Sequence, residues 1–141
     1  AVPDMAPQLA GARFAIGIEK GDDELVNKYS GKFFESDLCK DTTALNVVAR
    51  NITIKVKNPS EAALSAAEKA ITMALERTKP ETAPLLDTRA RVEFLQGKKE
   101  EAVKTQEKAL SLAGDGEKEE MSKALESYKG GELPAAEPVM Q

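Results

Sequence analysis

The stretch "ARVEFLQGKKEEAVKTQEKAL", residues 90–110, predicts two helices joined by a glycine turn. Before the turn, apolar and small residues recur at helical spacing at Leu86, Ala90 and Phe94. After the turn, a second stripe with helical spacing consists of Ala102, Val103, Gln106, Ala109, Leu110 and Ala113. Gly97 stands between the stripes, and glycine adopts positive φ without steric cost. The two helices are therefore expected to lie antiparallel and in close contact.

The first helix of this hairpin has a copy earlier in the chain. "ALNVVARNI" (44–52) matches "LLDTRARVE" (85–93), so that Ala49 aligns with Ala90 at a shift of 41 residues. Small residues at both positions allow a neighbouring helix to approach closely. The shared small residue predicts the same packing point in both copies.

The second helix is copied as well. "EAALSAAEKAITMA" (61–74) matches "EEAVKTQEKALSLA" (100–113), and Ala70 aligns with Ala109 at a shift of 39 residues. A fainter copy, "EKGDDELVNKYSGKFF", covers residues 19–34. Self-similarity with a period near 40 residues indicates a helical repeat array.

Capping residues refine the expected helix ends. Asp41 could cap a helix from about residue 42, and "NPSE" offers Asn58 as an N-cap with Pro59 at the first helical position. Asp22 after Gly21 and Asp115 after Gly114 each signal the end of one helix and the start of the next. The segment "NITIKVKN" (51–58) alternates apolar and polar residues, which alone favours a strand. The repeat register instead predicts the end of a helix there. The expected helices are 7–20, 22–38, 42–55, 59–78, 84–96, 98–113 and 116–129.

Composition narrows the function classes. The chain has 141 residues, of which 41% are hydrophobic and 31% charged, with a net charge of -4 that argues against nonspecific nucleic-acid binding. No apolar run is long enough to insert into a membrane. There is no His, the commonest general base and metal ligand, and the single Cys39 excludes an internal disulfide. We expect no catalytic residue, metal or cofactor, hence not an enzyme, and a structural role for Cys39.

The residues resemble a tetratricopeptide repeat (TPR) array, a family of helix-turn-helix units with small residues at fixed packing points. The best match is "LLDTRARVEFLQGKKEEAVKTQEKALSLAGD" (85–115), which contains the turn glycine and the small residues of both helices. The resemblance implies an all-α, right-handed superhelix of about three hairpins plus a C-terminal capping helix. The expected domain is 1–129, with repeats over about 7–38, 41–79 and 83–114, a capping helix over 116–129, and a flexible tail over 130–141.

What the resemblance implies about function is noncatalytic binding of a protein or peptide, or scaffolding. The sequence "LLDTRARV…GKKEEAVKTQEKAL" is also similar to TPR segments that follow thioredoxin-like domains in some exported bacterial proteins. An accessory C-terminal domain of a larger thiol-disulfide redox protein is therefore the alternative. This likeness slightly favours an exported, periplasmic location. The chain begins "AVPDMAP" without an initiator Met, which predicts a processed or excised piece of a longer protein.

The concave groove of TPR arrays is lined by the first helix of each pair, and it binds peptides. The resemblance assigns to that groove Asn46, Arg50, Asp87, Arg91 and Phe94. The guanidinium groups of Arg50 and Arg91, about 10 Å apart on neighbouring helices, would favour an acidic or carboxylate-ended peptide. The alternative is two ordinary intrahelical surface pairs, each worth about 0.2–0.5 kcal/mol.

Overall fold

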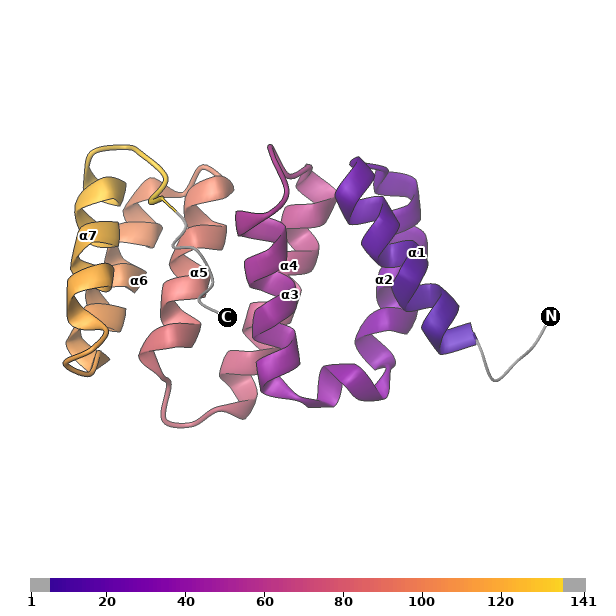
Figure 1. The fold of residues 1–141 in the computed structure, drawn as a ribbon, viewed down its shortest axis with the longest axis horizontal. Helices are drawn as coiled ribbons and strands as arrows, with labels where there is room; N and C mark the ends of the chain where they lie inside the picture. The colour runs from indigo at the N-terminus through magenta and orange to yellow at the C-terminus, as the bar shows by residue number, and fades with distance from the viewer. Residues whose placement is uncertain (1–5, 136–141) are drawn as a thin grey trace. The chain divides into compact units, whose positions relative to one another are not determined.

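The chain is all-α over residues 6–135, the part that the computed structural model describes (Figure 1). Seven α-helices and a short 3-10 helix fill this range, and no strand occurs within it. The elements are α1 (Ala6–Lys20), α2 (Asp23–Glu35), η2 (Asp37–Lys40), α3 (Thr42–Ile54), α4 (Glu61–Arg77), α5 (Ala83–Leu95), α6 (Lys99–Leu112) and α7 (Lys118–Lys129). The predicted helical class is confirmed. The predicted domain start at 1–5 and tail end at 136–141 lie outside the described residues.

The chain divides into two compact units. The first ends at Thr78 and contains α1 to α4, and the second begins at Lys79 and contains α5 to α7. Within the first unit, α1 packs on α2, α3 packs on α4, and α2 also contacts α4. Within the second unit, α6 packs on both α5 and α7.

Glycines in the left-handed region end three of the helices. Gly97 follows α5 with φ of 86°, and the next N–H, that of Lys98, donates to the Glu93 carbonyl at 2.9 Å. Gly21 after α1 and Gly131 after α7 have φ of 70° and 79° and are followed by the same kind of bond. This is the Schellman termination, in which a glycine reverses the chain and satisfies the last carbonyls of the helix. The glycine turn that the sequence predicts at residue 97 is confirmed.

The middle hairpin uses a different connection. The segment with the alternating pattern is helical as far as Ile54, so the expectation that it would not form a strand is correct. The predicted N-cap of the following helix is wrong. Asn58 has φ of 52° and lies outside α4, whereas the Ser60 hydroxyl oxygen accepts the N–H of Ala63 at 3.1 Å. Ser60 caps better because it directly precedes the first helical residue, where its oxygen reaches an unpaired N–H.

Two other helix ends differ from expectation. The predicted helix over 22–38 is interrupted at Ser36, and the four residues that follow form η2. The last helix begins at Lys118 rather than at 116. Ser36 has extended backbone angles, φ of -70° and ψ of 161°, which end α2 before residue 38, and residues 115–117 form a turn before α7.

Small residues form the helix contacts of the second unit. Ala90 on α5 and both Ala102 and Ala109 on α6 are fully buried. Ala90 and Ala102 share a core cluster with Ala124 and Tyr128 of α7. The alanines allow the helices to approach closely, and the one large ring fills the space that remains.

Candidate functional site

Asn46 and Arg50 lie on α3 in the first unit. The helix begins at the Asp41 cap, whose carboxylate accepts the Thr43 N–H at 2.9 Å. Leu45 and Ala49 on the adjoining face are fully buried in the core, which leaves the two candidate residues half-buried beside them. The Asn46 Oδ1 atom is buried and has no hydrogen-bond partner among the described residues. This oxygen is one of the few buried polar atoms that the fold leaves unsatisfied.

Asp87, on α5, has a partner that sequence reasoning missed. The Gln106 side-chain amide is fully buried and donates from Nε2 both to Asp87 Oδ1 at 2.9 Å and to the Met121 carbonyl at 3.1 Å. One amide group thus joins α5, α6 and α7. The signal was available, because Gln106 is the one polar member of the otherwise apolar stripe on α6, and a buried amide needs partners.

Arg91 donates to the main chain of the C-terminal segment. Its Nη1 lies 2.9 Å from the carbonyl oxygen of Pro134, in a half-buried contact. In Figure 1 the yellow segment after α7 turns back toward α5. The described part of the predicted tail, residues 130–135, is therefore not wholly detached, because it contacts a candidate site residue.

Phe94 belongs partly to the core. Its ring lies 5.1 Å from the ring of Tyr128, centroid to centroid, at a tilt of 39°. It packs half-buried against the cluster that contains Ala90 and Ala124. Phe94 is therefore only partly accessible to a ligand, because its ring also packs on Tyr128.

The residues predicted to line the groove are divided between the two units. Asp87, Arg91 and Phe94 lie along one side of α5, spaced four and three residues apart. Asn46 and Arg50 lie one turn apart on α3. A single groove that contains all five residues stays a prediction.

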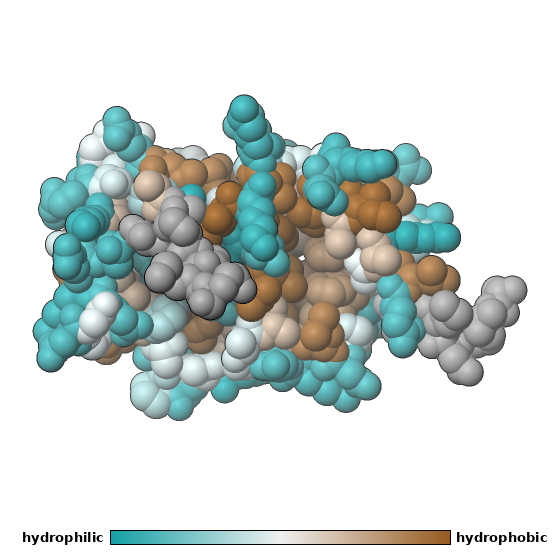
Figure 2. Space-filling model, in the orientation of Figure 1, coloured by the Kyte–Doolittle hydropathy of each residue, from teal (hydrophilic) through white to brown (hydrophobic). Residues whose placement is uncertain are grey.

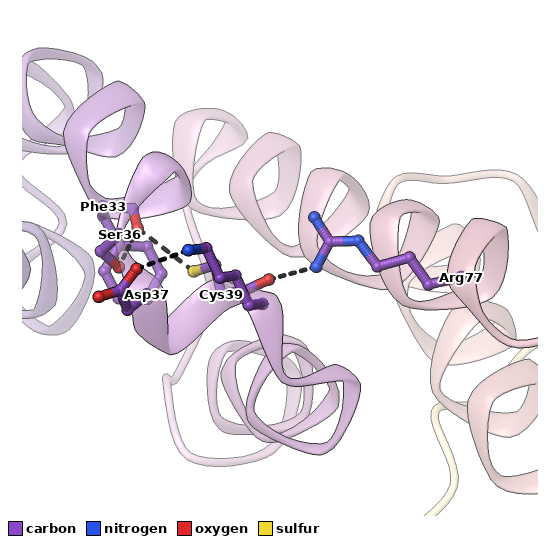
Figure 3. A network of polar contacts seen from close by, with 6 residues as sticks. Phe33, Ser36, Asp37, Cys39 and Arg77 are labelled. Atoms are coloured by element: carbon purple, nitrogen blue, oxygen red, sulfur yellow. Dashed lines mark hydrogen bonds and ion pairs between the residues drawn. The ribbon is translucent and has the colours of Figure 1, made fainter.

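The surroundings of Cys39 are those of a buried structural thiol (Figure 3). Its side chain is 2% exposed, and Sγ donates to the Phe33 carbonyl at 3.3 Å. Arg77, from α4, donates to the Cys39 carbonyl and so fastens η2 to the end of that helix. Burial raises the pKa of the Cys39 thiol and outweighs the opposing effects of the Ser36 hydroxyl and the Arg77 charge.

The raised pKa of Cys39 makes a contribution to stability that depends on pH. The folded chain keeps this proton to higher pH than the unfolded chain, so the contribution is complete below the unfolded pKa of about 8.5 and is lost as pH rises above it. We expect the difference in free energy of unfolding between the parent and Cys39→Ala to shrink from pH 7 to pH 9.5. Urea denaturation of both proteins at the two pH values measures this difference. Both proteins contain the same Lys and Tyr residues, so the titration of those residues cancels in the difference. A constant difference would contradict the prediction.

An exposed cluster on the first hairpin also escaped sequence reasoning. Arg13 of α1 donates to the Tyr29 hydroxyl of α2 at 2.5 Å, and its guanidinium carbon lies 5.3 Å from the ring centroid. The Lys28 ammonium lies 5.5 Å from the same centroid. The Arg13 hydrogen bond lowers the pKa of Tyr29. The cluster joins the two helices at their surface.

The remaining surface mixes apolar and charged side chains (Figure 2). Large apolar residues that stay exposed in the described chain are Leu9, Ile16, Leu38, Val47, Leu112 and Leu133. None of the described helices combines the length and the hydropathy that a membrane span requires. Within residues 6–135, no three potential metal ligands cluster together. Comparison of the chain with known protein families, curated proteins and solved structures gives no match.

Proposed function

We propose that the chain is a noncatalytic module that binds a protein or peptide through the first helices of a TPR-like array. The observation that carries this proposal is the bond between Arg91 and the main-chain carbonyl of Pro134. The accessible side of α5 already holds a non-helical stretch of polypeptide through an atom that every peptide offers. Recognition of the main chain is a general means by which proteins bind peptides.

The repeat interpretation is supported by the packing of the aligned small residues. Ala49 and Ala90, aligned in the first helices, are both fully buried, and so are Ala70 and Ala109, aligned in the second helices. The left-handed glycines that end α1 and α5 give two of the hairpins the same turn. On this interpretation the repeats belong to a right-handed TPR-like superhelix, in which the first helix of each repeat contributes to a concave face.

The partner proposed for this face is an acidic or carboxylate-ended peptide. Arg50 and Arg91 each present a planar fork that matches a carboxylate with two hydrogen bonds. Asn46 would add a hydrogen bond to the peptide backbone where ligand binding exposes its Oδ1 atom, which is buried in the free chain. Both arginines are only half-buried, so the attraction is screened by salt and the affinity is expected to be micromolar at best.

The double variant Arg50→Ala/Arg91→Ala tests this proposal. On an array of acidic and neutral peptides, we expect the parent to retain a subset of acidic peptides and the double variant to lose them. The matched control is Lys20→Ala/Lys104→Ala, which removes two exposed positive charges elsewhere and should keep binding. Circular dichroism establishes that each variant remains folded. A folded double variant that retained every partner would exclude the two arginines from the binding site.

A further inference from the structure

The segment after α7 lies against the binding face proposed for α5. We propose that residues 131–135 are an intramolecular ligand of α5, which competes with an external peptide of the same chemistry. This inference rests on the proposed function and names both its regulation and the class of partner. The partner is an extended peptide in which an acidic residue precedes an apolar residue and a proline, as in "GELPA" (131–135).

The direction of the segment is set by the end of α7. Gly131 has φ of 79°, its N–H donates to the Tyr128 carbonyl at 3.0 Å, and the Glu132 N–H donates to the Ser127 carbonyl at 2.9 Å. These bonds complete a Schellman termination, which reverses the chain at a fixed angle. The segment is thus aimed by the helix that precedes it and reaches Arg91 without a long linker.

The conformation of the segment suits main-chain recognition. Pro134 restricts Leu133 to extended backbone angles, which direct carbonyl groups outward instead of into a helix. Pro134 is half-buried, while Leu133 and Ala135 on either side are exposed. The contact therefore centres on the proline and on its carbonyl, which accepts from Arg91.

Two basic side chains of the same unit lie close to the segment, one near the residue before Glu132 and one near Pro134. Arg91 donates to the Pro134 carbonyl. The Lys99 ammonium lies near Gly131, 3.9 Å from the position that a Cβ atom on this glycine would occupy. We expect an external peptide with the same order of acidic, apolar and proline residues to lie along the same two basic side chains.

Attachment to α7 gives the segment an advantage over a free peptide. A ligand joined by a short connection has an effective concentration in the millimolar range. A partner must bind to the fraction of molecules in which the segment has left α5, and its apparent dissociation constant rises by the inverse of that fraction. The segment therefore raises the concentration of partner that binding requires.

The experiment compares the full chain with a variant that ends at Glu132. This shortened variant keeps both hydrogen bonds of the Schellman termination. It lacks Leu133 and Pro134 and therefore the contact between Pro134 and Arg91. The probe is a fluorescent peptide with the sequence of residues 130–141, measured by fluorescence anisotropy. We expect the shortened variant to bind it about tenfold or more tightly than the full chain does. The full-length variant Pro134→Gly, which loosens the segment, should be intermediate.

Controls fix the site of binding. Adding Arg91→Met to the shortened variant should abolish binding, whereas Lys104→Met, at an exposed position of α6, should leave it unchanged. A probe with the same residues in scrambled order should bind less tightly. Circular dichroism of each variant excludes loss of the fold as the cause.

The outcomes separate this inference from the proposed function. Equal affinity of the full and shortened chains, or binding that survives Arg91→Met, would overturn the intramolecular ligand. If array binding still depended on the two arginines, the proposed function would stand without it. If the shortened variant bound the probe but neither chain bound any array peptide, the intramolecular ligand would be supported and the proposed preference for acidic external peptides would fail.

Discussion

Tyr128→Ala is expected to destabilise the second unit by about 3–5 kcal/mol, as usual for removal of a large buried aromatic ring. The side chain is 1% exposed, and it is the largest member of the cluster that joins α5, α6 and α7. The other buried members of this cluster are alanines, which cannot expand into the space that the ring leaves. The cavity would also remove the face on which Phe94 packs, at 5.1 Å between ring centroids.

Urea denaturation followed by circular dichroism measures this loss. Tyr128→Phe keeps the ring and should cost much less, because it removes only the hydroxyl group. Lys129→Ala changes the exposed neighbour in the last turn of α7 and should alter stability by no more than about 0.5 kcal/mol. A loss below about 1 kcal/mol for Tyr128→Ala would mean that α7 is not an integral part of the core.

Gly17→Ala should destabilise the first unit by about 1–3 kcal/mol, as overpacking does elsewhere. A Cβ atom at this position of α1 would lie 2.9 Å from the Leu25 Cβ, 2.9 Å from the Val26 nitrogen and 3.1 Å from the Asp22 carbonyl oxygen. Two of these three atoms belong to the backbone of α2 and its cap, so no side-chain rotation relieves the contact. The first turn of α2 would have to move away from α1.

Gly31→Ala is the matched control for this prediction. Gly31 lies inside α2, and a Cβ built there meets no atom within 4 Å. Alanine is favoured over glycine in a helix by about 1 kcal/mol, so this variant should be more stable than the parent. Both variants make the same chemical change and are compared by thermal or urea denaturation. Equal stability of the two would contradict the close approach of α1 and α2 at Gly17.

Most helix positions could be predicted from local signals. The stripe around Ala90 and the glycine at 97 define α5 and α6 closely, because helical periodicity and a left-handed glycine both act within a few residues. Asp41 is predicted as a cap for the same reason, and both Asp41 and Asp22 accept an N–H of the helix that follows. The prediction of Asn58 as the N-cap of α4 is wrong because both Asn58 and Ser60 are residue types that cap helices. The sequence does not decide between them, whereas the folded backbone places Ser60 directly before α4.

The candidate site was less predictable, because its contacts join residues distant in sequence. Asp87 and Gln106 are 19 residues apart, and their bond depends on how α5 and α6 are rotated against each other. Arg91 binds a main-chain carbonyl 43 residues away, in a segment that the sequence marks only as loose. A backbone acceptor has no side-chain signature, so no pattern of residue types could have indicated it.

The left-handed glycines also bear on how such a chain can be lengthened. After α1 and α5, the glycine exit leads directly into a second helix, whereas after α7 it leads into the non-helical segment at 132–135. Gly131 has the same left-handed conformation as Gly21 and Gly97, each of which is followed by a second helix. Replacing the residues beyond it with an amphipathic sequence patterned on α6 would make α7 the first helix of a new hairpin. Gly131 is thus a built-in point for modular extension.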